Sequence, residues 1–340
     1  MTTILGIETS CDETAAAVVR DGRVVLSSVV SSQIDIHARF GGVVPEIASR
    51  AHVELLTPVI AEALVEAGVD EKGIDAVACT VGPGLIGSLL VGVSAAKATA
   101  LVWDVPFVGV NHLEAHFVAA FLEEPELEPP IVVLLVSGGH TMLVEVSEIG
   151  HYRVIGATID DAAGEAFDKV ARFLGLGYPG GPAIDREAMA GDPKAIRFPR
   201  GLLDDPGTAA EHKFNFSFSG LKTSVINYVR KHPDVSTADV CASFQEAAVD
   251  VLVTKARLAS RELGAKGMAL AGGVAANSVL RERILDACME DGIQGFLPSR
   301  AMCTDNAAMI AATGFYRLRD DGPTPLNAGA DPNLRIVQAR

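Results

Sequence analysis

Short apolar runs alternate with longer amphipathic patterns along much of the chain, and this alternation predicts an α/β protein. Residues 4–7 and 15–19 predict two strands joined by the polar turn ETSCDET. Residues 131–136 and 141–146 repeat this design around the turn SGGH. Because the same two strands and polar turn occur once in each half, we expect two similar lobes with a cleft between them.

An acidic, proline-rich stretch, EEPELEPP at residues 123–130, separates the two halves. Such a composition continues neither a helix nor a sheet, so it indicates a linker. We expect an N-terminal lobe over residues 1–125, a C-terminal lobe over residues 130–300 and a final helix within residues 301–330.

Three helices can be placed by their sequence patterns. One begins at Asp161 and carries an apolar stripe at helical spacing. A second follows a strand that ends at Ala271 and two glycines. The third is rich in alanine and is expected to begin at Thr304 or Asp305, and its small side chains permit close packing against other elements.

The segment NHLEAH follows a predicted strand over residues 107–110. Asn111 can cap the helix that begins there, and Glu114, three residues later, completes the capping-box pattern. His112 and His116 then lie four residues apart on one helical face, as two ligands of a single metal ion must. The alternative is a pair of surface histidines that bind no metal.

The same histidine spacing occurs in the H-E-x-x-H motif of zinc peptidases. In that motif the glutamate directly follows the first histidine. Here Glu114 lies two residues after His112, about 200° around the helix, and points away from a metal-bound water. The sequence therefore argues against peptidase chemistry.

Glycine-rich turns form a second group of candidate ligand sites. They are VSGGH at residues 136–140, YPGGPAID at residues 178–185 and AGGVAAN at residues 271–277. Such turns offer backbone N–H groups to an anion, although each alone is more often structural. A further turn, GPGLIG at residues 82–87, lacks the lysine of a P-loop. The Gly, Asp and Asn residues that gather in the second half favour a nucleotide site.

Composition narrows the protein class. The chain has 340 residues, 49% of them hydrophobic, so it can build a large core and is not disordered. Its five cysteines lie far apart without a C-x-x-C pair, which favours a reducing compartment. The N-terminus lacks the basic and apolar regions of a signal peptide, so we expect a cytoplasmic protein. The uncharged stretch 76–96 contains glycines and a proline, and it predicts a buried strand, turn and helix rather than a membrane span.

The net charge of −15 repels polyanions such as nucleic acids at long range. One segment, residues 194–231, is locally basic and is a candidate contact for a nucleic acid. The alternative is a solvated surface. Its basic residues are Lys194, Arg197, Arg200, Lys213, Lys222, Arg230 and Lys231.

The ordered motifs GIETSCDET, GGVVPEIASRAH, NHLEAH, LVSGGHT, IDDAAGEAFDK, YPGGP, FSFSGLKT, AGGVAAN and CTDNAAMIA resemble those of the TsaD family of tRNA threonylcarbamoyladenosine synthesis proteins, from residue 4 to about residue 314. The resemblance implies a two-lobed fold of the actin, sugar-kinase and Hsp70 type (ASKHA), with duplicated RNase H-like domains. It also implies an acyltransferase that moves a threonylcarbamoyl group from threonylcarbamoyl-AMP to the N6 amine of the adenosine just 3′ of the anticodon, in tRNAs that read codons beginning with A. The alternatives are a zinc metallopeptidase and an ATP-dependent kinase or ATPase on the same fold.

The resemblance also assigns site residues. His112, His116 and Asp305 would bind one divalent metal ion, Fe²⁺ in preference to Zn²⁺, and this requires the final helix to return to the N-terminal lobe. A helix N-cap is the alternative role for Asp305. No covalent nucleophile is implied, and we expect Cys11 to be a packed thiol. The residues that would bind the adenylate are Val136, Ser137, Gly138, Gly139, His140, Asp168, Gly181, Asp185 and Asn277.

Finally, the resemblance implies partners. These are tRNA, a degenerate paralogue of the TsaB type and a small P-loop ATPase of the TsaE type. No association with a membrane is implied. A separate enzyme would make threonylcarbamoyl-AMP.

Overall fold

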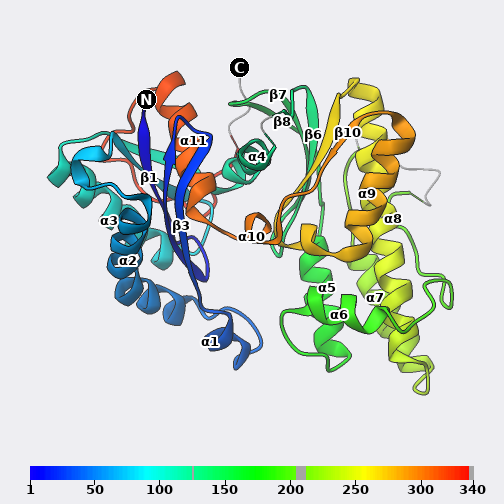
Figure 1. Cartoon of the computed structure of the whole chain (residues 1–340). Coiled ribbons are helices and arrows are strands. Elements are labelled where there is room, and N and C mark those ends of the chain that lie inside the picture. Colours follow the sequence, from blue (N-terminus) through cyan, green and yellow to red (C-terminus); the bar gives the residue numbers. More distant parts are fainter. Residues whose placement is uncertain (125, 204–211, 337–340) are drawn as a thin grey trace. The chain divides into compact units, whose positions relative to one another are not determined.

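The computed structural model of the chain describes residues 1–124, 126–203 and 212–336, and it forms two compact units (Figure 1). Unit 1 comprises Met1–Glu126 and Thr304–Arg340, and unit 2 comprises Leu127–Cys303. The predicted α/β architecture is confirmed, because each unit contains one five-stranded sheet covered by helices.

The sheet of unit 1 has the strand order β3-β2-β1-β4-β5. Strand β1 pairs antiparallel with β2 and parallel with β4, while β2 pairs antiparallel with β3 and β4 parallel with β5. Its elements are β1 (Thr3–Glu8), β2 (Glu13–Arg20), β3 (Val24–Ser32), α1 (Ile34–Ala38), α2 (Pro45–Ala67), the 3₁₀ helix η1 (Glu71–Gly73), β4 (Ala76–Gly82), α3 (Ile86–Trp103), β5 (Phe107–Asn111), α4 (His112–Glu123) and α11 (Ala307–Asp320).

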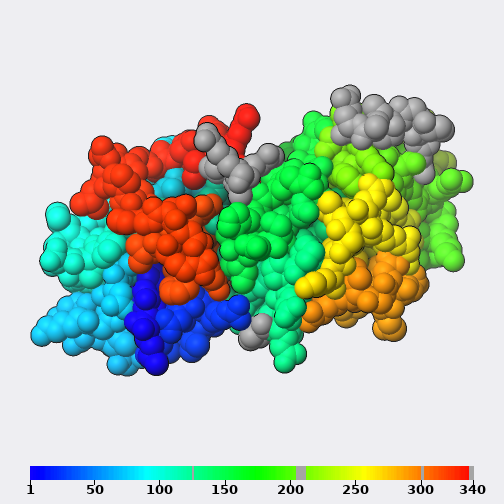
Figure 2. Space-filling model, turned by 90° about the horizontal axis from the view of Figure 1, so that it is seen from above, coloured from blue at the N-terminus to red at the C-terminus, as the bar shows by residue number. Residues whose placement is uncertain are grey.

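Helix α11 comes from the C-terminal end of the chain and packs on the N-terminal strands of unit 1 (Figure 1). It contacts β1, β2 and α4, whereas α2 packs on β2 and β3 and α3 packs on β4. Backbone atoms of Ala307 and Ala311 lie so close to Gly6 that no Cβ would fit there. Figure 2 shows the orange and red C-terminal residues on the surface beside the blue N-terminal ones. Small residues in both elements make this close packing possible.

The sheet of unit 2 has the strand order β10-β9-β6-β7-β8. Strand β6 pairs antiparallel with β7 and parallel with β9, while β7 pairs antiparallel with β8 and β9 parallel with β10. Its elements are β6 (Ile131–Val136), β7 (Thr141–Glu148), β8 (His151–Ala157), α5 (Ala163–Phe173), α6 (Gly180–Ala188), α7 (Ser219–Lys231), α8 (Thr237–Leu263), β9 (Gly267–Ala271), the 3₁₀ helix η3 (Gly273–Ala276), α9 (Ser278–Asp291), β10 (Gln294–Phe296) and α10 (Arg300–Cys303).

The two sheets have the same topology. In each, an antiparallel three-stranded meander is followed by two strands parallel to the first, in the same order across the sheet. The two apolar strand pairs predicted from the sequence are β1 with β2 and β6 with β7. This repetition confirms the expected duplication of one domain type.

Two helix starts differ from the prediction by two or three residues. Helix α5 begins at Ala163 rather than Asp161, because the Asp161 carboxylate pairs with Lys169 and Lys222 instead of capping the helix. Helix α11 begins at Ala307 rather than at residue 304 or 305. Its N-cap is Asn306, whose side chain accepts a hydrogen bond from the N–H of Met309 at 3.1 Å.

The uncharged stretch 76–96 forms β4, a turn and the first half of α3, as predicted. Among the described residues, α3 alone has the length and apolar composition of a membrane-crossing helix, and a third of its residues are buried. A single helix of this kind is weak evidence for a membrane span, because core helices share these properties.

Candidate functional site

Helix α4 of unit 1 begins at His112 and carries His116 one turn later. The side chain of Asn111 caps the helix and accepts hydrogen bonds from the N–H groups of Leu113 at 2.9 Å and Glu114 at 3.3 Å. The two imidazole rings lie edge to face, with their centroids 4.8 Å apart. Both histidines are buried, so the alternative of surface histidines is wrong.

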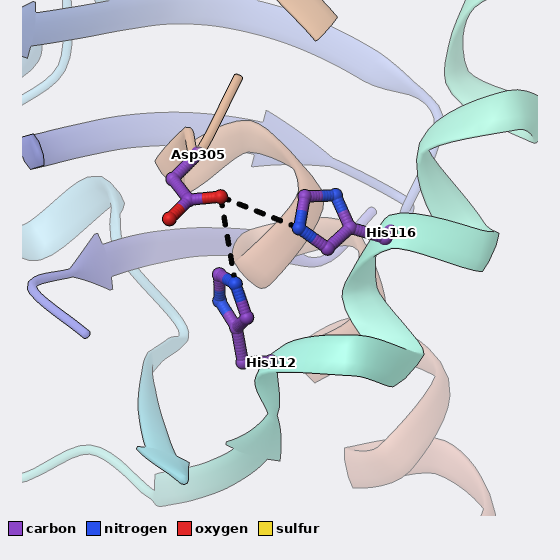
Figure 3. A group of neighbouring side chains, drawn as sticks. All are labelled: His112, His116 and Asp305. Carbon is purple, nitrogen blue, oxygen red and sulfur yellow. Dashed lines mark ion pairs between the residues drawn. The ribbon is translucent and has the colours of Figure 1, made fainter. Parts of the chain in front are cut away.

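Asp305 comes from the segment just before α11 and lies beside both histidines (Figure 3). Its Oδ1 atom is 3.4 Å from Nε2 of His112 and 3.3 Å from Nε2 of His116. Because Asn306 caps α11, the Asp305 carboxylate is not used as a cap and can face the histidines. The potential ligand atoms of the three residues lie within 4.8 Å of one another, which is close enough to hold one metal ion.

The donor set fits a metal ion. Two neutral imidazoles and one carboxylate form the 2-His-1-carboxylate combination that suits first-row divalent metals. Two Nε2 atoms converge on a single carboxylate oxygen. The Nδ1 atom of His116 is buried and has no hydrogen-bond partner among the described residues. No hydrogen bond at this nitrogen therefore holds the ring in an orientation other than the one that directs Nε2 toward Asp305.

The electrostatics of the site favour positive charge. Burial opposes charging of His112, but the carboxylates of Asp305 and Glu8 outweigh it and raise the pKa of His112 well above its usual range. Burial likewise opposes ionisation of Asp305, yet the two histidines hold the pKa of Asp305 far below its usual range. Two carboxylates around this position would therefore stabilise either a proton or a metal cation.

Glu114 does not take part in this site. Its two carboxylate oxygens bind the guanidinium group of Arg317 on α11, at 2.9 Å from Nε to Oε1 and 2.7 Å from Nη2 to Oε2. The predicted second half of the capping box is therefore wrong, because an ion pair with α11 takes the carboxylate. With both oxygens occupied, Glu114 cannot serve as the general base of a peptidase.

Cys11 lies in the turn between β1 and β2. Burial and the neighbouring acidic side chains raise the pKa of the Cys11 thiol well above its usual range. A thiol in this state is not a nucleophile at neutral pH. This agrees with the expectation that Cys11 is a packed thiol.

Two of the candidate nucleotide-binding turns of unit 2, residues 136–140 and 271–277, lie at the carboxyl ends of β6 and β9. These parallel strands are neighbours, with Leu135 opposite Ala271, so the turns that follow them lie at the same edge of the sheet. In the first turn, the N–H of His140 donates to the Ser137 hydroxyl at 3.1 Å. Gly138 and Gly139 have open space around them, and a side chain at Gly164 would meet the Ser137 carbonyl, so α5 begins against this turn.

The acidic and amide candidates contact neighbouring backbone and side chains. Asp168 accepts a hydrogen bond from the N–H of Gly180 at 2.7 Å, beside Gly181 in the first turn of α6. Asp185 accepts one from the Ser278 hydroxyl at 2.7 Å and one from the Asn277 amide at 3.3 Å. The Asn277 side chain also caps α9. The structure thus joins Asp185 to Asn277, which are far apart in the sequence.

The basic segment 194–231 lies in unit 2, and residues 204–211 within it are outside the described residues. Three of its basic residues form ion pairs with acidic residues of unit 2. These pairs join Arg200 to Asp250, Lys213 to Glu262 and Lys222 to Asp161. Lys194, Arg197, Arg230 and Lys231 are exposed. The cationic surface is therefore smaller than the sequence count suggests.

Two sheets of one topology define a two-lobed protein of the ASKHA class, and solved structures agree. Component A of (R)-2-hydroxyglutaryl-CoA dehydratase from Acidaminococcus fermentans has a TM-score of 0.56 at 13% identity, covering 94% of this chain and 100% of that one. HypF from T. kodakarensis has a TM-score of 0.65 at 15% identity, covering 94% of this chain and 48% of that one. At these identities the likeness shows the fold alone.

The sequence comparisons are more specific. The family model for TsaD, tRNA N6-adenosine threonylcarbamoyltransferase, matches residues 24–312. Proteins of that name from Caldicellulosiruptor saccharolyticus and Anaeromyxobacter dehalogenans are 52% and 56% identical to this chain. The first match covers 99% of both chains, and the second covers 99% of this chain and 100% of the relative. The chain therefore belongs to the TsaD family and is a transferase that modifies the N6 position of adenosine in tRNA.

Sequence reasoning missed three residues around the histidines: Glu8, Thr80 and Arg317. Glu8 had a detectable signal, since it is the charged last residue of an otherwise apolar strand. Arg317 had none, because its partner Glu114 lies 203 residues away in the sequence.

Proposed function

We propose that the donor is threonylcarbamoyl-AMP and that the acceptor is the adenosine just 3′ of the anticodon, in tRNAs that read codons beginning with A. In the reaction, the N6 nitrogen attacks the carbamoyl carbon, the bond from that carbon to the phosphate oxygen breaks, and AMP leaves with the electron pair. The amine gives up one proton. Membership of the TsaD family, whose name states the group and the acceptor atom, is the observation that carries this proposal.

An activated donor is needed because an aromatic amine is a poor nucleophile. A mixed anhydride with AMP supplies the driving force, so the enzyme has to position the reactants and stabilise charge rather than form a covalent intermediate. The high pKa of Cys11 is consistent with a mechanism that uses no thiol nucleophile.

We propose that His112, His116 and Asp305 bind one divalent metal ion, Fe²⁺ in preference to Zn²⁺. The geometry and charge of these three residues support this assignment. When bound, such an ion supplies Lewis-acid stabilisation of negative charge on a carbonyl or phosphate oxygen. The protein side chains orient the three ligands, and the two carboxylates that raise the pKa of His112 would equally stabilise a bound cation.

We propose that unit 2 binds the adenylate at the carboxyl edge of β6 and β9. Ser137, Gly138 and Gly139 would face the phosphate, because their turn is open and lies beside the N-terminus of α5. Val136 and His140 flank this turn. Asp168 and Gly181 would lie near the ribose, together with Asp185 and Asn277.

Asp185→Ala is expected to weaken AMP binding by about 1.5 to 3 kcal/mol through loss of a charge-assisted hydrogen bond. Isothermal titration calorimetry measures this effect. Ser278→Ala is the matched control, because it removes the 2.7 Å hydrogen bond to Asp185 but keeps the carboxylate. Equal loss of affinity in both variants would reduce Asp185 to a residue that holds α9 in place.

We propose that exposed basic residues of segment 194–231 contact tRNA phosphates. The double variant Lys194→Ala/Arg197→Ala is expected to flatten the slope of log affinity against log salt by about one to two units. Filter binding at several salt concentrations measures the slope. Arg153→Ala/Lys266→Ala removes the same charge elsewhere in unit 2, and an equal change there would exclude a local contact.

We propose that the chain works with two partner proteins, a TsaB-like paralogue and a TsaE-like P-loop ATPase. We also propose that it is located in the cytoplasm. The neighbouring helices α2 and α3 support the paralogue, because they expose Val53, Ile86 and Leu90 at 66%, 47% and 51%. An open pocket of about 590 Å³ lies beside this apolar surface, lined in part by Pro45, Leu85 and Ile86. A paralogue of the same fold would offer the same pair of helices and could cover this surface.

The five cysteines are all free thiols, and this supports the proposed location in a reducing compartment such as the cytoplasm.

Mass spectrometry of tRNA nucleosides tests the reaction directly. The protein is incubated with threonylcarbamoyl-AMP and unmodified tRNA, alone and with the two partner proteins. Threonylcarbamoyladenosine is expected at one position of the anticodon loop. Its absence with all components present would contradict the proposed donor.

A further inference from the structure

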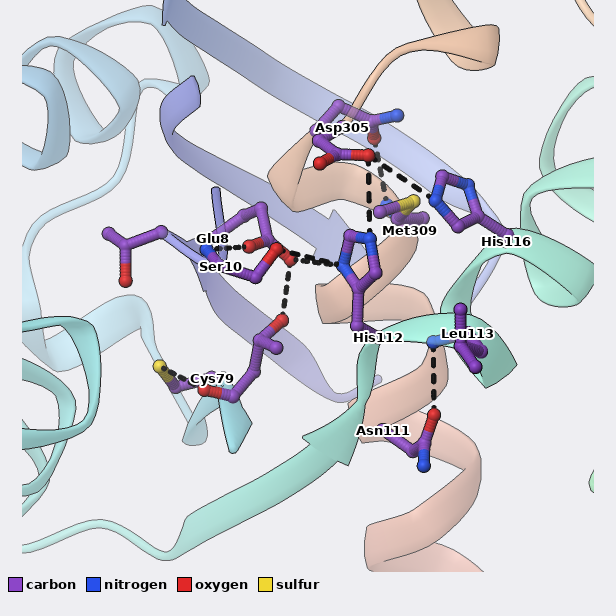
Figure 4. Close-up of polar contacts among 12 residues, drawn as sticks. Glu8, Ser10, Cys79, Asn111, His112, Leu113, His116, Asp305 and Met309 are labelled. Atoms are coloured by element: carbon purple, nitrogen blue, oxygen red, sulfur yellow. Dashed lines mark hydrogen bonds and ion pairs between the residues drawn. The ribbon is translucent and has the colours of Figure 1, made fainter. Parts of the chain in front are cut away.

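Glu8 is a completely buried carboxylate at the end of β1, next to the histidine and aspartate triad (Figure 4). Its Oε2 atom lies 3.0 Å from Nδ1 of His112 and accepts a hydrogen bond from the Thr80 hydroxyl at 2.5 Å. Its Oε1 atom accepts the backbone N–H of Ser10. Contacts from α4, β4 and the turn after β1 therefore fix this carboxylate in one orientation.

The imidazole of His112 has a different partner on each nitrogen. Nδ1 faces Glu8 at 3.0 Å, with the Ser10 hydroxyl farther off at 3.3 Å, and Nε2 faces Asp305. A bound metal ion takes the place of one imidazole proton, so the nitrogen that faces the hydrogen-bonded carboxylate keeps the remaining proton and the other presents a lone pair to the metal. The contact with Glu8 thus determines which nitrogen of His112 is available as a ligand.

We propose that Glu8 is a positioning residue that holds the proton on Nδ1 of His112 and so presents Nε2 to the metal ion. This inference rests on the proposed metal site. Glu8 acts through His112 and is not itself a ligand, because it contacts the nitrogen that faces away from Asp305.

His116 provides an internal comparison. It offers Nε2 to the same Asp305 oxygen at 3.3 Å, but its Nδ1 atom is buried without a hydrogen-bond partner among the described residues. Of the two imidazoles, only that of His112 is held by a carboxylate. A change at Glu8 therefore acts on one ligand of the three.

Glu8→Gln is a sharp test because its geometry is constrained. The N–H of Ser10 can only donate, whereas the Thr80 hydroxyl can turn and accept, so the amide oxygen of glutamine takes the Oε1 position. The amide NH₂ then faces Nδ1 of His112 and donates to it. In a neutral His112 the proton then lies on Nε2, which loses its lone pair, and the metal site loses one negative charge.

We expect Glu8→Gln to weaken Zn²⁺ binding about 10- to 100-fold, as is typical for loss of a hydrogen bond to a metal-bound histidine. Competition with a chromophoric chelator measures the affinity. Glu8→Asp keeps the charge with shorter reach and is expected to fall between the wild type and Glu8→Gln. Asp75→Asn is the control, because it removes the same charge at the other end of β1, where Asp75 accepts the N–H of Thr3 at 2.7 Å.

A spectroscopic readout distinguishes proton placement from general damage to the site. In the zinc-loaded wild type with ¹⁵N-labelled histidine, the His112 resonance is expected to show a proton on Nδ1. The Glu8→Gln variant is expected to lose that signal. If Glu8→Gln fails to fold, Glu8→Asp carries the affinity test alone.

The outcomes separate the two proposals. Wild-type protein that binds no metal would overturn the metal site and this inference together. Wild-type protein that binds metal, with unchanged affinity in the folded Glu8 variants, would overturn the role of Glu8 alone. A loss of affinity equal to that of Asp75→Asn would also overturn it, because the effect would then come from net charge.

Discussion

His112→Ala and Asp305→Ala are each expected to abolish metal binding and to lower threonylcarbamoyl transfer by at least about 100-fold, while the protein still folds. Each change removes one of the three proposed ligands, and two remaining ligands would leave the ion underbound. Metal content by mass spectrometry and tRNA modification should be measured on the same samples, and circular dichroism reports the fold.

His151→Ala is the matched control for this prediction. His151 lies on β8, and its side chain is 52% exposed and outside the triad. It is expected to keep both metal and activity. Full activity in a His112 or Asp305 variant that holds no metal would remove the metal ion from the mechanism.

Arg317→Ala is expected to destabilise the protein by about 3 kcal/mol, the lower end of the range for a broken buried ion pair. Glu114 is 2% exposed and would lose the partner of both its oxygens, whereas Arg317 itself is partly reached by water. Burial raises the pKa of Glu114 even though Arg317 acts to lower it, so the buried carboxylate depends on Arg317 to stay charged. Urea unfolding followed by circular dichroism measures the loss.

Two further variants test the cause. Arg319→Ala removes an exposed ion pair with Asp320 and is expected to change stability by less than about 1 kcal/mol. Glu114→Leu combined with Arg317→Met replaces the pair by apolar side chains and is expected to recover most of the loss. If Arg317→Ala is as stable as the wild type, the pair does not hold α4 to α11.

Local sequence signals predicted the parts of the fold that depend on near neighbours. The paired strands β1 with β2 and β6 with β7 were predicted because apolar runs flank a polar turn in each. The cap of α4 was predicted because Asn111 and its N–H donors lie within three residues.

The features that the sequence did not predict depend on contacts between distant residues. The resemblance placed Asp305 beside the histidines, but its alternative role as a helix cap stayed open, because only the structure shows that the neighbouring Asn306 caps α11. Glu114 fits a capping box locally, and only the packing of α11 against α4 reveals its pairing with Arg317. Glu8 and Thr80 come together because β1 and β4 are neighbours in the sheet.

The place of α11 has a consequence for biosynthesis. A ribosome makes β1 to α4 first, but the helix that covers these strands and the residue Asp305 are made about 180 residues later. Unit 2 lies wholly within the intervening segment and can fold while unit 1 still lacks α11. A nascent chain halted near Cys303 would expose the apolar face that α11 normally covers, and would offer a metal ion two histidines without their carboxylate. Quality-control proteases and chaperones would therefore meet an incomplete N-terminal unit until the last stretch of the chain leaves the exit tunnel.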